Sequence, residues 1–265
     1  MPFARTPTGR VHYSERGEAR DGSLPVLLIH GAGASSAIWM MTLARLGRAT
    51  RAVAIDLPGH GPSPRGEGEV SIAGYRDATG LLAASLCLGR SVLVGHSMGA
   101  LVAMEAALAW PDKVAALVLC GAAPRLPVRD DVLAIVRDDY DRFPGWLAEH
   151  ALSPAAKPAL RRAFVAAGVA ASPETTLADY AAIAAFDLGA RVKSLACPVV
   201  WLHGADDRVV PTPIVDQLGP NHALAIIPDA GHILPVEAPA VIAATALRLA
   251  HLDVKKTPAF SLPAN

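Results

Sequence analysis

Short apolar segments recur along the chain, and each of them stops at a glycine, proline or aspartate. Each holds four or more aliphatic or β-branched residues, which is typical of strands buried on both faces of a sheet. The segments span residues 24–31, 51–61, 91–97, 114–124, 197–204 and 222–232. Stretches of helical spacing lie between them, over residues 36–47, 73–88, 98–110, 213–219 and 237–250. Because strand and helix alternate, the sequence predicts a doubly wound, mostly parallel α/β sheet.

One region interrupts this alternation. Residues 125–193 are Ala-rich helical segments broken by five prolines, which predicts a helical insertion rather than a second sheet. The chain has 265 residues, 52% of them hydrophobic, so it can bury one large core. We therefore expect a core built from residues 1–124 and 194–253, the insertion over 125–193, and a loose tail over 254–265.

The charges and cysteines exclude several classes of partner. Lys and Arg total 24, and so do Asp and Glu, so no long-range field holds nucleic acid or an anionic membrane surface. The three cysteines lie in apolar surroundings without metal-ligand spacing, and their odd number suits a reducing compartment. The start, MPFARTPTGR, lacks the apolar stretch of a signal peptide, and no run reaches the about 18 apolar residues of a membrane span. We expect a cytoplasmic protein that acts on a small-molecule substrate and binds neither nucleic acid nor a membrane. The sequence does not indicate its oligomeric state.

One serine lies where a predicted strand meets a predicted helix. In VLVGHSMGALVAM, Ser97 has Gly95 on one side and Gly99 on the other. In so abrupt a turn, a Cβ two residues before or after the serine would collide with the neighbouring strand or helix. The turn holds the hydroxyl at the carboxyl edge of the sheet, beside helix amides that favour negative charge. Ser97 is therefore a candidate nucleophile, the alternative being that it only caps the helix over 98–110.

Three further loops at the same edge carry groups that a serine nucleophile needs. Residues 30–33 (HGAG) lie at the end of the first apolar segment and form either a plain turn or a loop whose N–H groups face an oxyanion. Asp206 and Asp207 follow the fifth segment, and His232 is the last residue of the sixth. A serine hydroxyl attacks when an imidazole takes its proton, and the imidazole needs a carboxylate on its other nitrogen. The order serine, acid, histidine predicts nucleophilic catalysis, with the choice between the two acids open.

Together these motifs resemble the α/β-hydrolase superfamily, in its serine-nucleophile esterase and lipase branch, over about residues 9–250. HGAG, DLPGHGPS, GHSMGA, HGADDRVVP and GHILPVEAP follow the family's order and approximate spacing. The resemblance implies Ser97 as nucleophile and His232 as general base. It also implies an oxyanion hole made by the main-chain N–H groups of Ala32 and Met98. Neither a cofactor nor a metal is expected.

The same resemblance chooses between the two acids and gives the insertion a role. The family pattern G-x-x-D-x-x-x-P, matched to residues 204–211, implies Asp207 as the triad acid. Asp206 is then left to accept hydrogen bonds from loop amides or to pair with Arg208. Residues 125–193 are implied to form a helical cap over the active site, inserted after the sixth strand of the family's sheet.

Departures from related families narrow the chemistry. Haloalkane dehalogenases and epoxide hydrolases of this fold use an aspartate where this chain has Ser97. The meta-cleavage C–C hydrolases usually resemble GNSMGG at this turn, with a Trp after the catalytic histidine where this chain has Ile233. We expect hydrolysis of a small or medium uncharged carboxylic ester through an acyl-enzyme. A lactonase, a perhydrolase or a C–C hydrolase or lyase on the same triad is the alternative, as is a receptor of the same fold without turnover.

The residues expected to shape the site are apolar. The insertion has nine Lys or Arg and nine Asp or Glu, so bulk charge selects no charged substrate. In DLPGHGPS, Asp56 and His60 are expected to brace a loop rather than to react. The candidate walls of the substrate pocket are Trp39, Phe143, Trp146 and Leu234.

Overall fold

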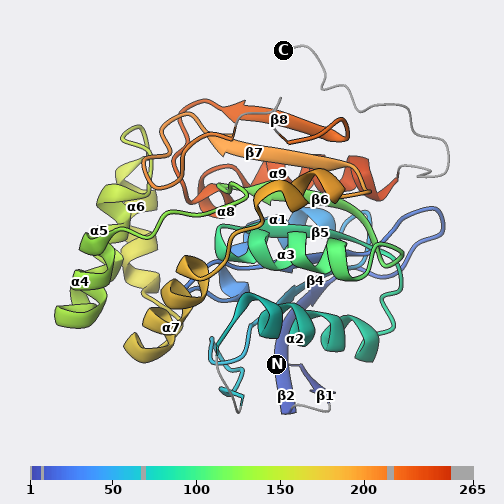
Figure 1. Ribbon diagram of the computed structural model, residues 1–265, viewed down its shortest axis with the longest axis horizontal. Coiled ribbons are helices and arrows are strands. Elements are labelled where there is room, and N and C mark those ends of the chain that lie inside the picture. The colour runs from blue at the N-terminus through green and yellow to red at the C-terminus, as the bar shows by residue number, and fades with distance from the viewer. Residues whose placement is uncertain (1, 7–8, 67–69, 214–217, 252–265) are drawn as a thin grey trace.

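The computed structural model describes residues 2–6, 9–66, 70–213 and 218–251. Within them, eight strands form one sheet in the order β1-β2-β4-β3-β5-β6-β7-β8 (Figure 1). β2 runs antiparallel to both of its neighbours, and every other adjacent pair is parallel. The strands are β1 (Phe3–Thr6), β2 (Gly9–Arg16), β3 (Val26–Ile29), β4 (Ala52–Ile55), β5 (Ser91–His96), β6 (Val114–Cys120), β7 (Val199–Gly204) and β8 (His222–Ile227).

Helices cover both faces of the sheet. Successive residues of a strand point to opposite faces. In β3, Val26 and Leu28 pack in the cluster that includes α1 and α9, whereas Leu27 and Ile29 pack in the cluster that includes α2 and α3. This confirms the predicted doubly wound fold. The helices on the two faces are η1 (Ser36–Trp39), α1 (Met40–Leu46), α2 (Ile72–Ser85), α3 (Met98–Ala109), α8 (Leu234–Glu237) and α9 (Pro239–Ala250).

The remaining helices all lie between β6 and β7 in the chain. They are α4 (Asp130–Asp138), η2 (Tyr140–Arg142), α5 (Phe143–His150), α6 (Pro158–Ala167), α7 (Pro173–Ala184) and η3 (Gly189–Ser194). Figure 1 shows α4, α5, α6 and α7 gathered beyond one end of the sheet, next to the carboxyl ends of β7 and β8. We call the part of the chain between β6 and β7, residues 121–198, the α4–α7 segment. No helix of the described residues combines the length and the apolarity that crossing a membrane requires.

The structure differs from the sequence analysis in a few elements. The sequence does not predict β1 and β2, because these strands lie at the edge of the sheet and β2 reads GRVHYSER, without a continuous apolar run. The predicted strand over 51–61 ends at Ile55, and the rest of it is a loop. Most of the predicted helix over 213–219 falls on residues 214–217, outside the described residues, and so does the predicted tail over 254–265.

The contact between β7 and β8 includes a titratable hydrogen bond. Nε1 of the buried Trp201 donates to Nδ1 of His222 over 3.1 Å. Burial lowers the pKa of His222 to about 4. In the unfolded chain the imidazole returns to a pKa of about 6.5. Between these two values the unfolded state binds more protons, so the burial of the neutral ring costs stability as the pH falls from about 6.5 towards 4.

We predict that His222→Gln reduces this acid-induced loss of stability. Glutamine keeps an acceptor for Trp201 but does not titrate. The free energy of unfolding from urea titrations should fall less between pH 6.5 and pH 4, by on the order of 1 kcal/mol after a discount for the partly exposed ring. An H222Q protein with the same pH dependence as the wild type would contradict this account.

Candidate active site

Ser97 lies between β5 and α3 in a strained main-chain conformation. Its φ is +52° and its ψ is −118°, a region that residues with a side chain rarely occupy and that costs about 1–3 kcal/mol. A Cβ at Gly95 would collide with the main chain of Gly99 and Ala100. A Cβ at Gly99 would collide with the carbonyl group of Ile29. The two glycines therefore allow α3 to begin directly against the end of β3, which forces the sharp turn at Ser97.

The hydroxyl of Ser97 does not cap the following helix. Its side chain makes no capping hydrogen bond, and its main chain is not in the extended conformation of an ordinary N-cap. The capping alternative is therefore wrong. Ser97 instead lines a cavity of about 410 Å³ together with His96 and His232. Its main-chain N–H donates to the carbonyl oxygen of Cys120 over 3.0 Å, which fastens the turn to the end of β6.

His232, in the loop after β8, is held on several sides. Its Nδ1 donates to Oδ2 of Asp207 over 2.9 Å. Its main-chain N–H donates to the carbonyl of Ala151 over 2.7 Å, and its own carbonyl accepts from Nε2 of His96 over 2.9 Å. Gly121, with a φ of +55°, leaves room for the ring, since a Cβ there would lie 3.0 Å from Nδ1. Because Asp207 occupies Nδ1, Nε2 is the nitrogen left to exchange a proton.

The buried carboxyl group of Asp207 is stabilised in its charged form. Its Oδ1 accepts from the main-chain N–H groups of Val209 and Val210, over 2.8 and 3.0 Å. Burial alone would raise the pKa of Asp207, but the hydrogen bond and charge of His232 and these two amides hold it below its usual value. A carboxylate at this position fixes the tautomer of the ring and stabilises it when it becomes positively charged.

The adjacent acid, Asp206, points elsewhere. Its Oδ2 accepts from the hydroxyl of Ser153, in the α4–α7 segment, over 2.5 Å. Arg208 donates to the carbonyl groups of Glu149 and Leu152, so the expected pairing of Asp206 with Arg208 is wrong. The sequence motifs alone do not choose between these two acids, and the structure brings Asp207 and not Asp206 to His232.

Two main-chain N–H groups near Ser97 are free to bind an anion. A Cβ on Gly31 would lie 3.2 Å from the Cβ of Ser97, so the loop after β3 packs against the serine. Ala32 follows in this loop, and Met98 is the first residue of α3, where N–H groups lack intrahelical partners. Within the described ranges, neither N–H group meets an acceptor. These are the two groups that the resemblance implies for the oxyanion hole.

The cavity beside Ser97 is mainly apolar. Among the described residues that line it, Arg129 is the one Lys, Arg, Asp or Glu, and its guanidinium group is paired with Asp131. Met40 and Met41 belong to the lining and are 64% and 55% exposed. The walls therefore favour an uncharged ligand. Other apolar side chains of the lining are Ile38, Leu126, Val132, Leu147, Leu160, Phe164, Ile183, Val209 and Val236.

The expected pocket walls are only partly found in the lining. Trp146 lines the cavity, but Trp39, Phe143 and Leu234 do not. Trp39 and Leu234 are fully buried in the cluster under α1 and α9, and Phe143 packs inside the α4–α7 segment. Their large apolar side chains turn to the core, because burial there removes more of their surface from water. Sequence reasoning missed Met40 and Met41, whose only signal is an apolar pair shortly after HGAG.

The other residues singled out in the sequence have structural contacts. The carboxyl group of Asp56 forms a hydrogen bond with Nδ1 of the buried His12. His60 is fully buried, and its Nε2 forms a hydrogen bond with Asp179. Among the residues that the structure describes, no three His, Cys, Asp or Glu side chains are grouped as a metal ion would need.

Comparison with known proteins places the chain. Residues 26–245 match the Alpha/beta hydrolase family. The chain belongs to this family. Pimeloyl-[acyl-carrier protein] methyl ester esterase of Edwardsiella ictaluri is a similar α/β hydrolase, 30% identical over 229 residues that cover 80% of this chain and 87% of the relative. A thermophilic esterase from Thermogutta terrifontis has a TM-score of 0.78 at 26% identity, over 95% of this chain and 99% of that one. The esterase from Exiguobacterium antarcticum shares the fold, with a TM-score of 0.83 at 20% identity over 96% of this chain and 99% of that one.

The geometry predicts different results for the two neighbouring acids. Asp207→Asn leaves His232 without a carboxylate on Nδ1, so kcat should fall by about 10⁴. Asp206→Asn alters a contact with Ser153 instead, so this matched control should keep at least roughly a tenth of the wild-type kcat and show mainly a small loss of stability. Steady-state kinetics on p-nitrophenyl esters, with circular dichroism to establish folding, provide the measurement. Folded variants that rank in the opposite order would transfer the role to Asp206.

Proposed function

We propose that this α/β hydrolase is a serine esterase that cleaves small or medium uncharged carboxylic esters through an acyl-enzyme. One observation carries the proposal. Ser97 lies in a strained turn with its hydroxyl unused as a cap, and it lines an apolar cavity with His232, whose other ring nitrogen is bonded to buried Asp207. A nucleophile, a base and an orienting carboxylate are the parts that acyl transfer needs.

The protein is an ester-hydrolysing member of its family, since the Edwardsiella relative is a methyl ester esterase and the Thermogutta neighbour is an esterase. From these relatives we infer that this protein cleaves an ester bond, but we do not infer that its substrate is carried by an acyl carrier protein. The α4–α7 segment balances nine basic and nine acidic residues, and the cavity wall is apolar, so both favour an uncharged small molecule.

In the proposed acylation step, Oγ of Ser97 attacks the carbonyl carbon while Nε2 of His232 takes the hydroxyl proton. The oxyanion of the tetrahedral intermediate accepts hydrogen bonds from the N–H groups of Ala32 and Met98. His232 then returns the proton to the leaving alcohol as the C–O bond breaks. Asp207 keeps the ring in the tautomer that exposes Nε2 and stabilises the imidazolium form.

Deacylation repeats the sequence with water as the nucleophile. His232 removes a proton from water, the hydroxide attacks the acyl carbonyl, and the proton goes to Oγ of Ser97 as the acid leaves. His96 supports this step without titrating. Burial, and then the charge of His232, lower the pKa of His96 to about 3, so the ring stays neutral and its Nε2–H keeps holding the carbonyl of His232.

The proposal predicts the behaviour of Ser97→Ala. The variant should fold like the wild type but lose turnover of p-nitrophenyl esters by a factor of roughly 10³ or more. The wild type should release a burst of nitrophenol equal in amount to the protein, followed by steady turnover. Substantial esterase activity in S97A would place the chemistry elsewhere. A wild type that shows a ligand-induced thermal shift but no turnover of any ester would be a receptor rather than an esterase.

The cavity wall predicts which changes alter chain-length preference. Trp146→Ala removes a large side chain from the wall and enlarges the cavity. The ratio of kcat/KM for long acyl chains to kcat/KM for the acetate ester should therefore rise roughly tenfold, with the value for acetate nearly unchanged. Val165→Ala, on the neighbouring helix α6 but outside the lining, is the matched control. Rates on p-nitrophenyl acetate, butyrate and octanoate give the comparison. Identical profiles for W146A and the wild type would remove Trp146 from substrate selection.

A further inference from the structure

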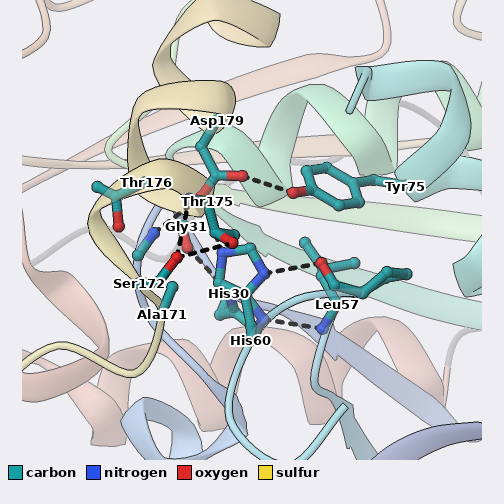
Figure 2. Close-up of polar contacts among 12 residues, drawn as sticks. His30, Gly31, Leu57, His60, Tyr75, Ala171, Ser172, Thr175, Thr176 and Asp179 are labelled. Carbon is teal, nitrogen blue, oxygen red and sulfur yellow. Dashed lines mark hydrogen bonds and ion pairs between the residues drawn. The ribbon is translucent and has the colours of Figure 1, made fainter. Parts of the chain in front are cut away.

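One buried carboxyl group joins the α4–α7 segment to two loops of the core. Asp179 of α7 is fully buried. Its Oδ2 accepts from the N–H of Gly33 over 3.0 Å and from Nε2 of His60 over 2.8 Å, and its Oδ1 accepts from the hydroxyl of Tyr75 over 2.5 Å. Figure 2 shows Asp179 reaching down from α7 between Tyr75 and the paired rings of His30 and His60. Three elements, the loops after β3 and β4 and helix α2, thus meet at one side chain.

The ring of His60 lies beside this carboxyl group. Nδ1 of His60 faces the carbonyl of Pro58 over 3.2 Å, and Nε2 faces Asp179. His60 is thus held at both of its ring nitrogens. His30 lies 4.8 Å away, ring centre to ring centre. Burial, and then the charge of His60, lower the pKa of His30, so that His30 remains neutral.

The neutral ring of His30 holds the peptide unit that carries the N–H of Ala32. Nδ1 of His30 donates to the carbonyl of Gly31 over 2.8 Å, and its Nε2 accepts from the N–H of Leu57 over 3.0 Å. The carbonyl of Gly31 and the N–H of Ala32 belong to the same planar peptide group, so fixing one fixes the other. This pair of bonds is drawn in Figure 2.

The next peptide unit is held by the α4–α7 segment. The N–H of Gly33, which belongs to this unit, donates to Asp179. The carbonyl of Gly33, in the peptide unit after it, accepts from the N–H of Ala170 over 2.9 Å. Gly33 has a φ of +66°, and a Cβ there would lie 2.9 Å from Cγ1 of Val169, so the segment packs on this turn without space for a side chain. The two peptide units that flank the Cα of Ala32 are thus held, one by His30 and the other by Asp179, which restrains the direction of the Ala32 N–H.

We propose that Asp179 is a positioning residue for the oxyanion hole, and this inference rests on the function proposed above. It touches no reacting atom. Through the N–H of Gly33 it fixes the peptide unit that follows the Cα of Ala32, and so it restrains the loop whose Ala32 N–H binds the oxyanion. The α4–α7 segment therefore shapes the catalytic centre as well as the cavity wall.

The alternative is that Asp179 only anchors α7 for stability. The two roles differ in which kinetic constant they change, because an oxyanion hydrogen bond is made in the transition state and not in the bound ester. Loss of an anchor lowers the melting temperature and the fraction of folded protein, and it leaves kcat per folded molecule unchanged. Loss of positioning lowers kcat at constant KM.

Asp179→Asn is the test variant. The amide oxygen of the variant takes the place of Oδ2 and accepts from Gly33 and His60, but it carries no charge, so both hydrogen bonds weaken. The amide NH2 group replaces the oxygen that faces Tyr75. We expect kcat on p-nitrophenyl butyrate to fall roughly 10- to 100-fold, with KM within about threefold. An alkyl trifluoromethyl ketone, which forms an oxyanion on the serine, should bind more weakly by a similar factor. Binding of an apolar alcohol as product analogue should not change.

Tyr75→Phe is the matched control. It removes the third hydrogen bond to the same carboxyl group, on the oxygen that faces away from Gly33. Its melting temperature should fall, but kcat and the affinity for the ketone should stay within about threefold of the wild type. Equal effects of D179N and Y75F on kcat, or a loss confined to KM, would overturn the proposal.

His60→Gln carries the test if D179N does not fold. Glutamine keeps a donor for Asp179 but removes the ring that packs 4.8 Å from the ring of His30. The peptide unit that His30 holds is then less fixed, so kcat should fall at constant KM. A folded H60Q protein with wild-type kcat would overturn the proposal. Failure of this inference is distinct from failure of the proposed function. The first leaves a wild type that turns over esters through Ser97, whereas the second leaves no Ser97-dependent turnover.

Discussion

A close main-chain approach beside Ser97, where Gly99 lies against the end of β3, sets the geometry of the candidate site. No side chain fits there, so α3 begins as soon as β5 ends, and Ser97 takes a positive φ between them. The same approach brings the loop that follows β3 beside Ser97, because β3 and β5 are neighbours in the sheet. The serine and the free N–H groups are therefore placed by the packing of one helix on one strand.

The α4–α7 segment contacts the parts of the site that β-strands alone do not fix. The carbonyl of Ala151 holds the main chain of His232, and Ser153 donates from its hydroxyl to Asp206 and from its N–H to Glu237. Burial raises the pKa of Glu237, although it also accepts from the N–H of Gly231. At the other end of the segment, Asp179 holds the loop after β3. The segment is thus part of the frame of the site.

Much of this arrangement can be predicted from the sequence, for physical reasons. Strands such as β3 and β5 are buried on both faces and read as continuous apolar runs, whereas β1 and β2 at the edge do not. The sequence also places Ser97, Asp207 and His232 at one edge of the sheet, where the structure has them. Trp39 and Leu234 were misplaced because an apolar helical residue gives no sign of whether it faces a cavity or the core. Asp179 was not predicted as part of the site, since in LADYAA it reads as an ordinary acid on an Ala-rich helix and its partners come from distant loops.

The hydrogen bond between His96 and the carbonyl of His232 joins residues 136 positions apart. A contact of such long range closes a large loop of chain, which is slow and comes late in folding. In the sheet, β6 and β7 lie between β5, which ends at His96, and β8, which precedes His232, so these strands have to pair for the bond to form. On a ribosome, most of the sheet emerges before the loop that carries His232 is synthesised. In the proposed mechanism the nascent chain then holds Ser97 without a base, so the enzyme is catalytically silent until the loop after β8 has been made and folded.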